Sequence, residues 1–197
     1  GDFSTDARRF REATGWKPVE GKLLSRFARD VSPANPLPEY PRPQMVRKDW
    51  LNLNGLWDAK LGDGTESRIL VPFAVESALS GVMKHTDRLT YHRSFEIPKS
   101  WRGRHVLLHF GAVDWEAAVW VNGQELGTHR GGYDGFSFDI TDALKPSGDQ
   151  EIVELVREDA EALGCLAEVE RARRAKISHR AWQRANARKA AKVRLIS

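Results

Sequence analysis

Apolar and polar residues alternate along residues 49–156 in short runs, and turn-forming residues separate one run from the next. In the run 89–97, Tyr91, Arg93, Phe95 and Ile97 fall on one side of an extended chain. A period of two, with this content of β-branched and aromatic residues, is typical of half-buried β-strands. We therefore expect strands within 53–61, 67–73, 89–97, 105–113, 115–123, 136–140 and 150–156.

No stretch of helix-length periodicity interrupts these runs. Parallel strands joined by crossover helices are therefore not expected. Consecutive short strands with turns between them favour an all-β fold, and an antiparallel β-sandwich of jelly-roll type fits the pattern best.

The residues on either side of this region have a different character. Residues 1–48 include five prolines between Ser32 and Gln44. Proline fixes φ and moves its predecessor out of the helical region, so the pattern predicts an extended Pro-rich arm. The arm is either a flexible linker or a segment that lies along the next domain, anchored by Leu37 and Tyr40. Residues 157–197 are rich in Ala, Glu and Arg and predict a helical tail.

Charge is distributed unevenly along the chain. The net charge is +4, yet residues 171–197 alone carry ten Lys and Arg and no acidic residue. The remaining residues have 21 basic and 27 acidic side chains, so the body of the protein is acidic and the tail basic. The tail could therefore bind nucleic acid or another anionic partner, although charge runs of this kind are more often simply solvated.

Other compositional features exclude several classes of protein. Cys165 is the single cysteine, so neither an intramolecular disulfide nor a cysteine-based zinc site is expected. No apolar run reaches the roughly 18 residues of a membrane helix. No P-loop or dinucleotide-binding fingerprint occurs, and no cofactor is expected. Localisation stays open.

The stretch VNGQELGTHRGGYDGFSFDIT, residues 121–141, predicts a hairpin, a glycine-rich bend and a further strand. Asn122 and Gly123 both tolerate positive φ, which a type I′ hairpin turn requires. Tyr133 and Asp134 lie within the bend, where a ring beside a carboxylate can hold a polyol by stacking and hydrogen bonding. The alternative is a tight corner in which Asp134 bonds its own backbone.

This stretch also belongs to a wider set of motifs. GAVDWEAAVWVNGQELGTHRGGYDGFSFDIT, LPEYPRPQMVRKDWLNLNGLW and VPFAVESALSG together resemble the N-terminal sugar-binding domain of glycoside hydrolase family 2, which includes β-galactosidases, β-glucuronidases and β-mannosidases. The resemblance implies a galactose-binding-like jelly roll, a β-glycoside as ligand and a catalytic barrel as partner domain. Glu76 and Ser77 match a region that reaches toward that barrel; the alternative is loop closure, with Ser80 and Gly81 completing a turn.

Catalysis by this chain alone is not expected, because in the family both catalytic glutamates lie on the barrel. Asp114 and Glu116 could form a carboxylate pair on one strand face, but the alternative is that Asp114 caps a bend while Glu116 faces solvent. His105 and His109 would lie about 13 Å apart on a strand, so metal binding is not expected. Surface or loop positions are expected for His85, His92 and His129, and packed core positions for Trp57, Trp101, Trp115 and Trp120.

The resemblance stops after Val156, where the family's ligand-facing aspartate and closing strands are expected. Residues 157–197 are either a genuine helical tail or the product of a shifted reading frame. If the closing strands are missing, the sandwich should have an unpaired edge. The predicted function is a non-catalytic carbohydrate-binding domain of a family 2 enzyme, in truncated or fragment form. The alternative is a stand-alone sugar-binding or adaptor module whose basic tail binds an anionic partner.

Overall fold

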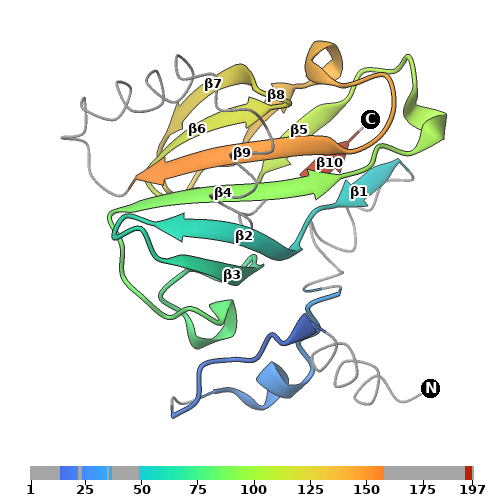
Figure 1. The fold of residues 1–197 in the computed structure, drawn as a ribbon. Coiled ribbons are helices and arrows are strands. Elements are labelled where there is room, and N and C mark those ends of the chain that lie inside the picture. The colour runs from blue at the N-terminus through green and yellow to red at the C-terminus, as the bar shows by residue number, and fades with distance from the viewer. Residues whose placement is uncertain (1–13, 22–23, 35, 37–48, 158–193, 197) are drawn as a thin grey trace, which may run out of the picture.

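The computed structural model describes residues 14–21, 24–34, 36, 49–157 and 194–196. Two antiparallel β-sheets make up most of this part of the chain (Figure 1). The larger sheet has six strands, in the order β3 (Glu66–Val71), β2 (Gly55–Leu61), β4 (Arg88–Phe95), β9 (Gln150–Arg157), β6 (Glu116–Val121) and β7 (Gln124–Arg130). The smaller sheet has the order β1 (Trp50–Asn52), β10 (Arg194–Ile196), β5 (Leu107–Phe110) and β8 (Phe136–Asp139).

The hydrophobic core joins the two sheets. Along β2 every second residue is buried, and Trp57 is only 1% exposed. Ile152 of β9 and Leu108 of β5 belong to the same cluster of buried side chains, although they lie in different sheets. The alternation seen in the sequence thus produces two apolar faces that pack against each other, which is the arrangement of a β-sandwich.

Strands β4 and β9 are the longest and lie at the centre of the larger sheet. They pair over eight residues, from Arg88 opposite Arg157 to Phe95 opposite Gln150. This register places Tyr91 directly opposite Glu154, on the face that also carries buried Phe95. Tyr91, Arg93 and Phe95 thus share one face of β4 as predicted, whereas Ile97 lies beyond the end of the strand.

The hairpin predicted at residues 121–124 joins β6 to β7. Asn122 has φ 51° and Gly123 has φ 83°, so both central residues occupy the left-handed region. The Asn122 side chain donates to the carbonyl of Ala143 and to Gln150 Oε1, each at 2.8 Å. The turn is therefore built as predicted and is also tied to the loop before β9.

Short 3₁₀ helices occupy several loops: η1 (Arg26–Arg29), η3 (Ala78–Ser80), η4 (Lys99–Trp101) and η5 (Thr141–Ala143). Part of the N-terminal extension packs on the domain. Trp16 is 6% exposed and its indole N–H donates to the carbonyl of Ser80 at 3.4 Å, while Val19 N–H donates to the carbonyl of Ala78 at 2.9 Å. Leu37, Tyr40 and most of the Pro-rich arm lie outside the described residues. So does the predicted helical tail, except for Arg157, which ends β9, and residues 194–196.

Residues 194–196 of the tail differ from the expectation. They form strand β10 instead of a helix, and β10 lies between β1 and β5. Strand β10 lies inside the smaller sheet, whose edge strands in the described residues are β1 and β8, so the expectation of an unpaired edge stays a prediction. Residues 194–196 form a strand because they pair in antiparallel register with both β1 and β5. This pairing satisfies backbone hydrogen-bonding groups of all three strands.

Three side chains also depart from the sequence-based expectation. Trp120 of β6 is only partly buried and does not belong to the core cluster. Trp115 is 38% exposed and does not lie in the core, because it precedes β6, whose alternation begins at Glu116. His92 is buried on β4, because Glu151 on the neighbouring strand accepts a hydrogen bond from its ring at 2.6 Å. Within the described residues, no helix is long and apolar enough to cross a membrane.

Candidate functional site

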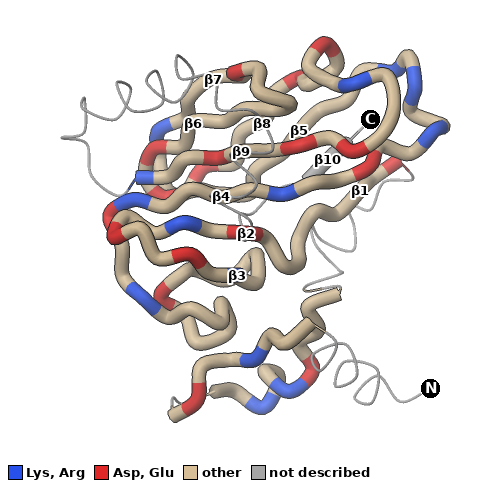
Figure 2. The backbone as a smooth tube through the Cα atoms, in the orientation of Figure 1, with Lys and Arg blue, Asp and Glu red and all other residues tan. Residues whose placement is uncertain are grey.

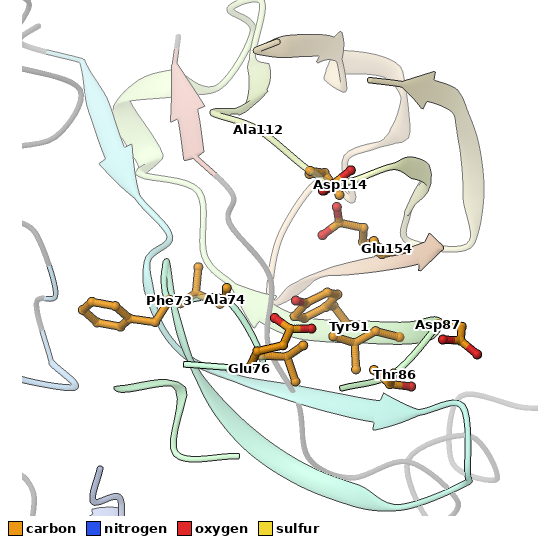
Figure 3. A pocket seen from close by; sticks show the side chains of 14 residues that line it. Phe73, Ala74, Glu76, Thr86, Asp87, Tyr91, Ala112, Asp114 and Glu154 are labelled. Carbon is orange, nitrogen blue, oxygen red and sulfur yellow. The ribbon is translucent and has the colours of Figure 1, made fainter. Parts of the chain in front are cut away.

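A cavity of about 180 Å³ opens at the end of the sandwich where β3 ends and β4 begins. Its walls come from residues within 71–76, 86–91, 112–114 and 154–156. Polar side chains gather there from all four segments (Figure 3): Glu76, Thr86, Asp87, Tyr91, Asp114 and Glu154. Strand alternation explains the inner members, since Tyr91 and Glu154 are opposite each other on the inward face of the larger sheet.

The residues that line the cavity range from fully buried to largely exposed to solvent. Glu154 is 0% exposed, whereas the Asp87 side chain is 84% exposed. Four of the lining residues are acidic, and none of the described lining residues is Lys, Arg or His. His85 lies beside the rim, with its ring nitrogens 3.9 Å from Glu76 and 3.3 Å from Asp87. The interior is therefore strongly acidic, with basic character only at its edge.

Tyr91 supplies a hydroxyl group to this acidic cavity. Burial, followed by the nearby carboxylates of Glu154 and Glu76, raises the pKa of Tyr91 above its ordinary value. The phenol therefore keeps its proton at neutral pH and can donate a hydrogen bond, while the carboxylates can accept. Donors and acceptors around one small space suit a ligand that carries several hydroxyl groups.

The loop after β3 holds Glu76 at the cavity. Ser80 is fully buried, and its hydroxyl donates to the carbonyl of Val75 at 2.9 Å and accepts from the N–H groups of Val82 and Met83. Ser77 caps η3 by accepting from Ser80 N–H at 3.2 Å. Ser77 therefore stabilises the loop by capping η3, whereas the side chain of Glu76 lines the cavity.

Asp114 reaches the cavity because the glycine-rich bend makes room for it. A Cβ built on Gly132 would overlap the Asp114 carboxylate. The bend is held in place by Gly131, whose N–H donates to the carbonyl of Trp115 at 2.9 Å and whose φ of +125° suits glycine. These glycines therefore allow a close approach of the Asp114 side chain.

Tyr133 and Asp134, the other two predicted site residues, lie outside this cavity. Tyr133 is 97% exposed and Asp134 is exposed beside it. The structure thus brings Glu76 together with Tyr91 and Glu154, and leaves the two bend residues on the surface. A sugar contact by Tyr133 and Asp134 stays a prediction.

The residues considered for catalysis or metal binding have other partners. Glu116 forms an ion pair with Arg130 on β7 and does not point freely into solvent. His105 contacts Asp139 at 3.2 Å, and His109 forms a hydrogen bond with Ser137. No cluster of three or more potential metal ligands occurs in the described segments.

Sequence reasoning missed Tyr91 and Glu154 as site residues. The signal was present in QEIVELV, residues 150–156, where Glu154 occupies an inward position between Ile152 and Val156. A carboxylate at an inward position of an alternating strand indicates a buried polar site. Tyr91 gave no comparable signal, because a tyrosine at such a position is ordinary core.

Comparisons with known proteins agree with one another. The family model described as "Glycosyl hydrolases family 2, sugar binding domain" matches residues 42–162. A β-glucuronidase of Paenibacillus borealis is 26% identical over 133 residues, and one of Bacteroides fragilis is 32% identical over 105 residues. These matches cover 59% and 50% of this chain, but only 22% and 15% of the relatives' own length.

The solved structures that match part of this chain include β-glucuronidases. One from an uncultured Clostridium species has a TM-score of 0.49 at 22% identity, covering 57% of this chain and 23% of that one. One from Dictyoglomus thermophilum has a TM-score of 0.49 at 25% identity, covering 60% of this chain and 21% of that one. The family model spans more than half of the chain, and the chain therefore belongs to glycoside hydrolase family 2 through its sugar-binding domain.

Proposed function

We propose that residues 49–156 act as the non-catalytic carbohydrate-binding domain of a family 2 glycoside hydrolase. In this proposal the sandwich is a jelly roll and supplies part of the rim of the sugar site. Hydrolysis of O-glycosyl bonds then depends on two glutamates of a catalytic barrel that lies outside the 197 residues. The observation that carries the proposal is the polar cavity formed by the loop with Glu76, by Tyr91 and by Glu154.

The size of the cavity supports a partial site. At about 180 Å³ it is smaller than the roughly 300–1,000 Å³ of complete small-molecule sites. A cavity of this size can enclose part of one sugar ring, and the remaining contacts must come from another surface. We therefore expect this chain alone to bind a monosaccharide glycoside with a Kd on the order of millimolar.

The negative charge of the cavity predicts which glycosides bind it more tightly. Four carboxylates with no described cation among them repel a further carboxylate at short range. A neutral glycoside should therefore bind this cavity better than a glycuronide does. No contact of the described residues favours the alternative role as an adaptor with a nucleic-acid-binding tail.

The expected preference of the cavity for a neutral glycoside can be tested by two-dimensional NMR titration. The full chain is titrated with methyl β-galactoside and, separately, with methyl β-glucuronide. We expect the signals of residues 74–76 and 86–91 to shift, with weaker binding of the glucuronide. Tyr91→Phe removes one donor and should weaken binding of the galactoside about fivefold. Glu76→Gln removes one negative charge, so it should reduce the difference in affinity between the galactoside and the glucuronide.

Glu125→Gln on β7 is the matched control, because it removes the same charge from an exposed position away from the cavity. It should leave both affinities unchanged. Shifts that avoid the cavity, or a glucuronide that binds more tightly than the galactoside, would contradict the proposal.

A further inference from the structure

A second, larger concavity lies at the opposite end of the same strands. It has a volume of about 660 Å³ and lies between residues 96–104 and residues 141–150; we call it the basic groove. Residues 96–97 follow the end of β4 and Gln150 begins β9, whereas the acidic cavity uses Tyr91 and Glu154 of the same two strands. With a rise of about 3.3 Å per residue, the two concavities are separated by roughly 15–20 Å.

The charge of the basic groove is the reverse of that of the cavity. Its lining includes four cationic side chains, Lys99, Arg102, Arg104 and Lys145, and a single carboxylate, Glu96. Figure 2 shows Lys and Arg gathered on the loops at this end of the sheet. The two ends of one sandwich thus present opposite charges to a ligand.

Three of the four cations have no carboxylate partner within the described residues. Arg104 is paired with Asp49 at 3.0 Å, and Lys145 Nζ donates to the carbonyl of Asp149 at 3.0 Å. Lys99 and Arg102 are exposed and form no such ion pair in the described part. They are therefore available to an anionic group, and the guanidinium of Arg102 can bind it with two parallel hydrogen bonds.

Both walls of the basic groove are held in place before any ligand arrives. Gln150 is 2% exposed; its Oε1 accepts from Lys145 N–H at 2.8 Å and its Nε2 donates to the carbonyl of Gly148 at 2.8 Å. On the other wall, Trp101 is 4% exposed and its carbonyl accepts from Arg104 N–H at 3.1 Å. Preformed walls reduce the entropy that a ligand must overcome on binding.

From these features we infer that the basic groove is a second ligand site, which binds an anionic saccharide carrying carboxylate or sulfate groups. A volume of about 660 Å³ is within the range of small-molecule sites. Ile97 and Leu144 offer apolar contacts to the faces of sugar rings, Ser147 offers a hydroxyl, and the cations pair with the acidic groups. A saccharide is preferred to an acidic peptide because the chain belongs to a sugar-binding family.

The test uses the full chain, with trigalacturonate as the anionic probe and maltotriose as a neutral probe of similar size. We expect trigalacturonate to shift the NMR signals of residues 99–104 and 145–148, and maltotriose to leave them unchanged. Binding should weaken as salt is added, because the contacts are charge-assisted. Lys99→Gln together with Arg102→Gln should lower the affinity about tenfold.

Arg184→Gln together with Arg188→Gln is the matched control, because it removes the same charge from the basic tail. It should change the affinity less than twofold. Loss of binding in this control with retention in the groove variant would assign the anion to the tail and overturn the inference. Equal shifts with maltotriose, or tighter binding of hexaglutamate than of trigalacturonate, would overturn it as well. Because the groove and the acidic cavity use different residues, these outcomes are independent of the proposed function.

Discussion

At the scale of single residues, the least expected feature is a buried histidine between carboxylates. His92 Nε2 lies 2.6 Å from Glu151 Oε1, and its Nδ1 lies 3.8 Å from Asp58 Oδ2. Burial alone would lower the pKa of His92, but the hydrogen bonds and charges of Asp58 and Glu151 outweigh it and raise the pKa above its ordinary value. The ring of His92 therefore lies between β2 and β9, and its surroundings favour the imidazolium form over the neutral ring.

The pH dependence of stability follows from this raised pKa. A histidine whose pKa is higher in the folded protein stabilises it fully below the unfolded value of about 6.5, and loses that contribution as the pH rises through the folded value. We expect His92→Gln to lower the free energy of unfolding by about 2 kcal/mol at about pH 5.5 and by clearly less at about pH 8.5. Urea denaturation at the two pH values measures both differences.

His85→Gln is the control for this experiment, because the His85 side chain is 70% exposed. It should change the free energy of unfolding by less than about 0.5 kcal/mol. A His92→Gln effect that grows with pH would contradict the raised pKa of His92.

At the scale of elements, the hairpin between β6 and β7 combines local and distant interactions. The positive φ angles of Asn122 and Gly123 are local and could be predicted from two adjacent residues. Asn122 also donates to Ala143 and Gln150 and accepts from Glu151 N–H at 2.9 Å, and none of these contacts follows from the turn itself. The turn therefore aligns β6 with β9 as well as with β7.

Two substitutions separate these contributions. Asn122→Gly keeps the left-handed conformation but removes three hydrogen bonds, and should lower the free energy of unfolding by about 2–3 kcal/mol. Gly123→Ala keeps the hydrogen bonds but places a Cβ on a residue with φ 83°. It should lower the free energy of unfolding by about 1 kcal/mol. Thermal unfolding of the two variants measures the difference; a larger loss for Gly123→Ala would mean that the distant hydrogen bonds contribute little.

At the scale of the whole molecule, the smaller sheet depends on the end of the chain. Strand β1 pairs with β10, and β10 in turn pairs with β5, so residues 194–196 connect two strands that are far earlier in sequence. Leu195 stands opposite both Leu51 and Leu108. Because β10 lies between two strands, each of its backbone N–H groups points toward one of them.

Leu195→Pro tests this dependence. Proline removes the backbone N–H and imposes a φ that differs from that of a strand, so β10 should no longer join β1 to β5. We expect faster hydrogen exchange at the amides of 50–52, while the amides of β4 and β9 stay protected. Leu195→Val keeps the N–H and should exchange like the original chain; unchanged protection of 50–52 in the proline variant would contradict the role of β10.

Sequence patterns predicted much of this architecture but less of the site. The runs around Trp57, Phe95 and Ile152 were recognised as strands because alternation with a period of two is a local property of the chain. Glu76, which lines the acidic cavity, was proposed from a motif in its own loop. Tyr91 and Glu154 were not, because their significance comes from the register that places them opposite each other.

The amino-acid sequence by itself determined the strands, the type I′ turn and the family, since each is written in neighbouring residues or in ordered motifs. Only the tertiary structure decided which polar groups meet. Pairing of β4 with β9 sets the acidic cavity at one end of the sandwich and the basic groove at the other. The sequence specifies which side chains carry charge. The electrostatic field at a site, however, depends on the distances between those charges, and these are set only when the strands pair and the sheets pack.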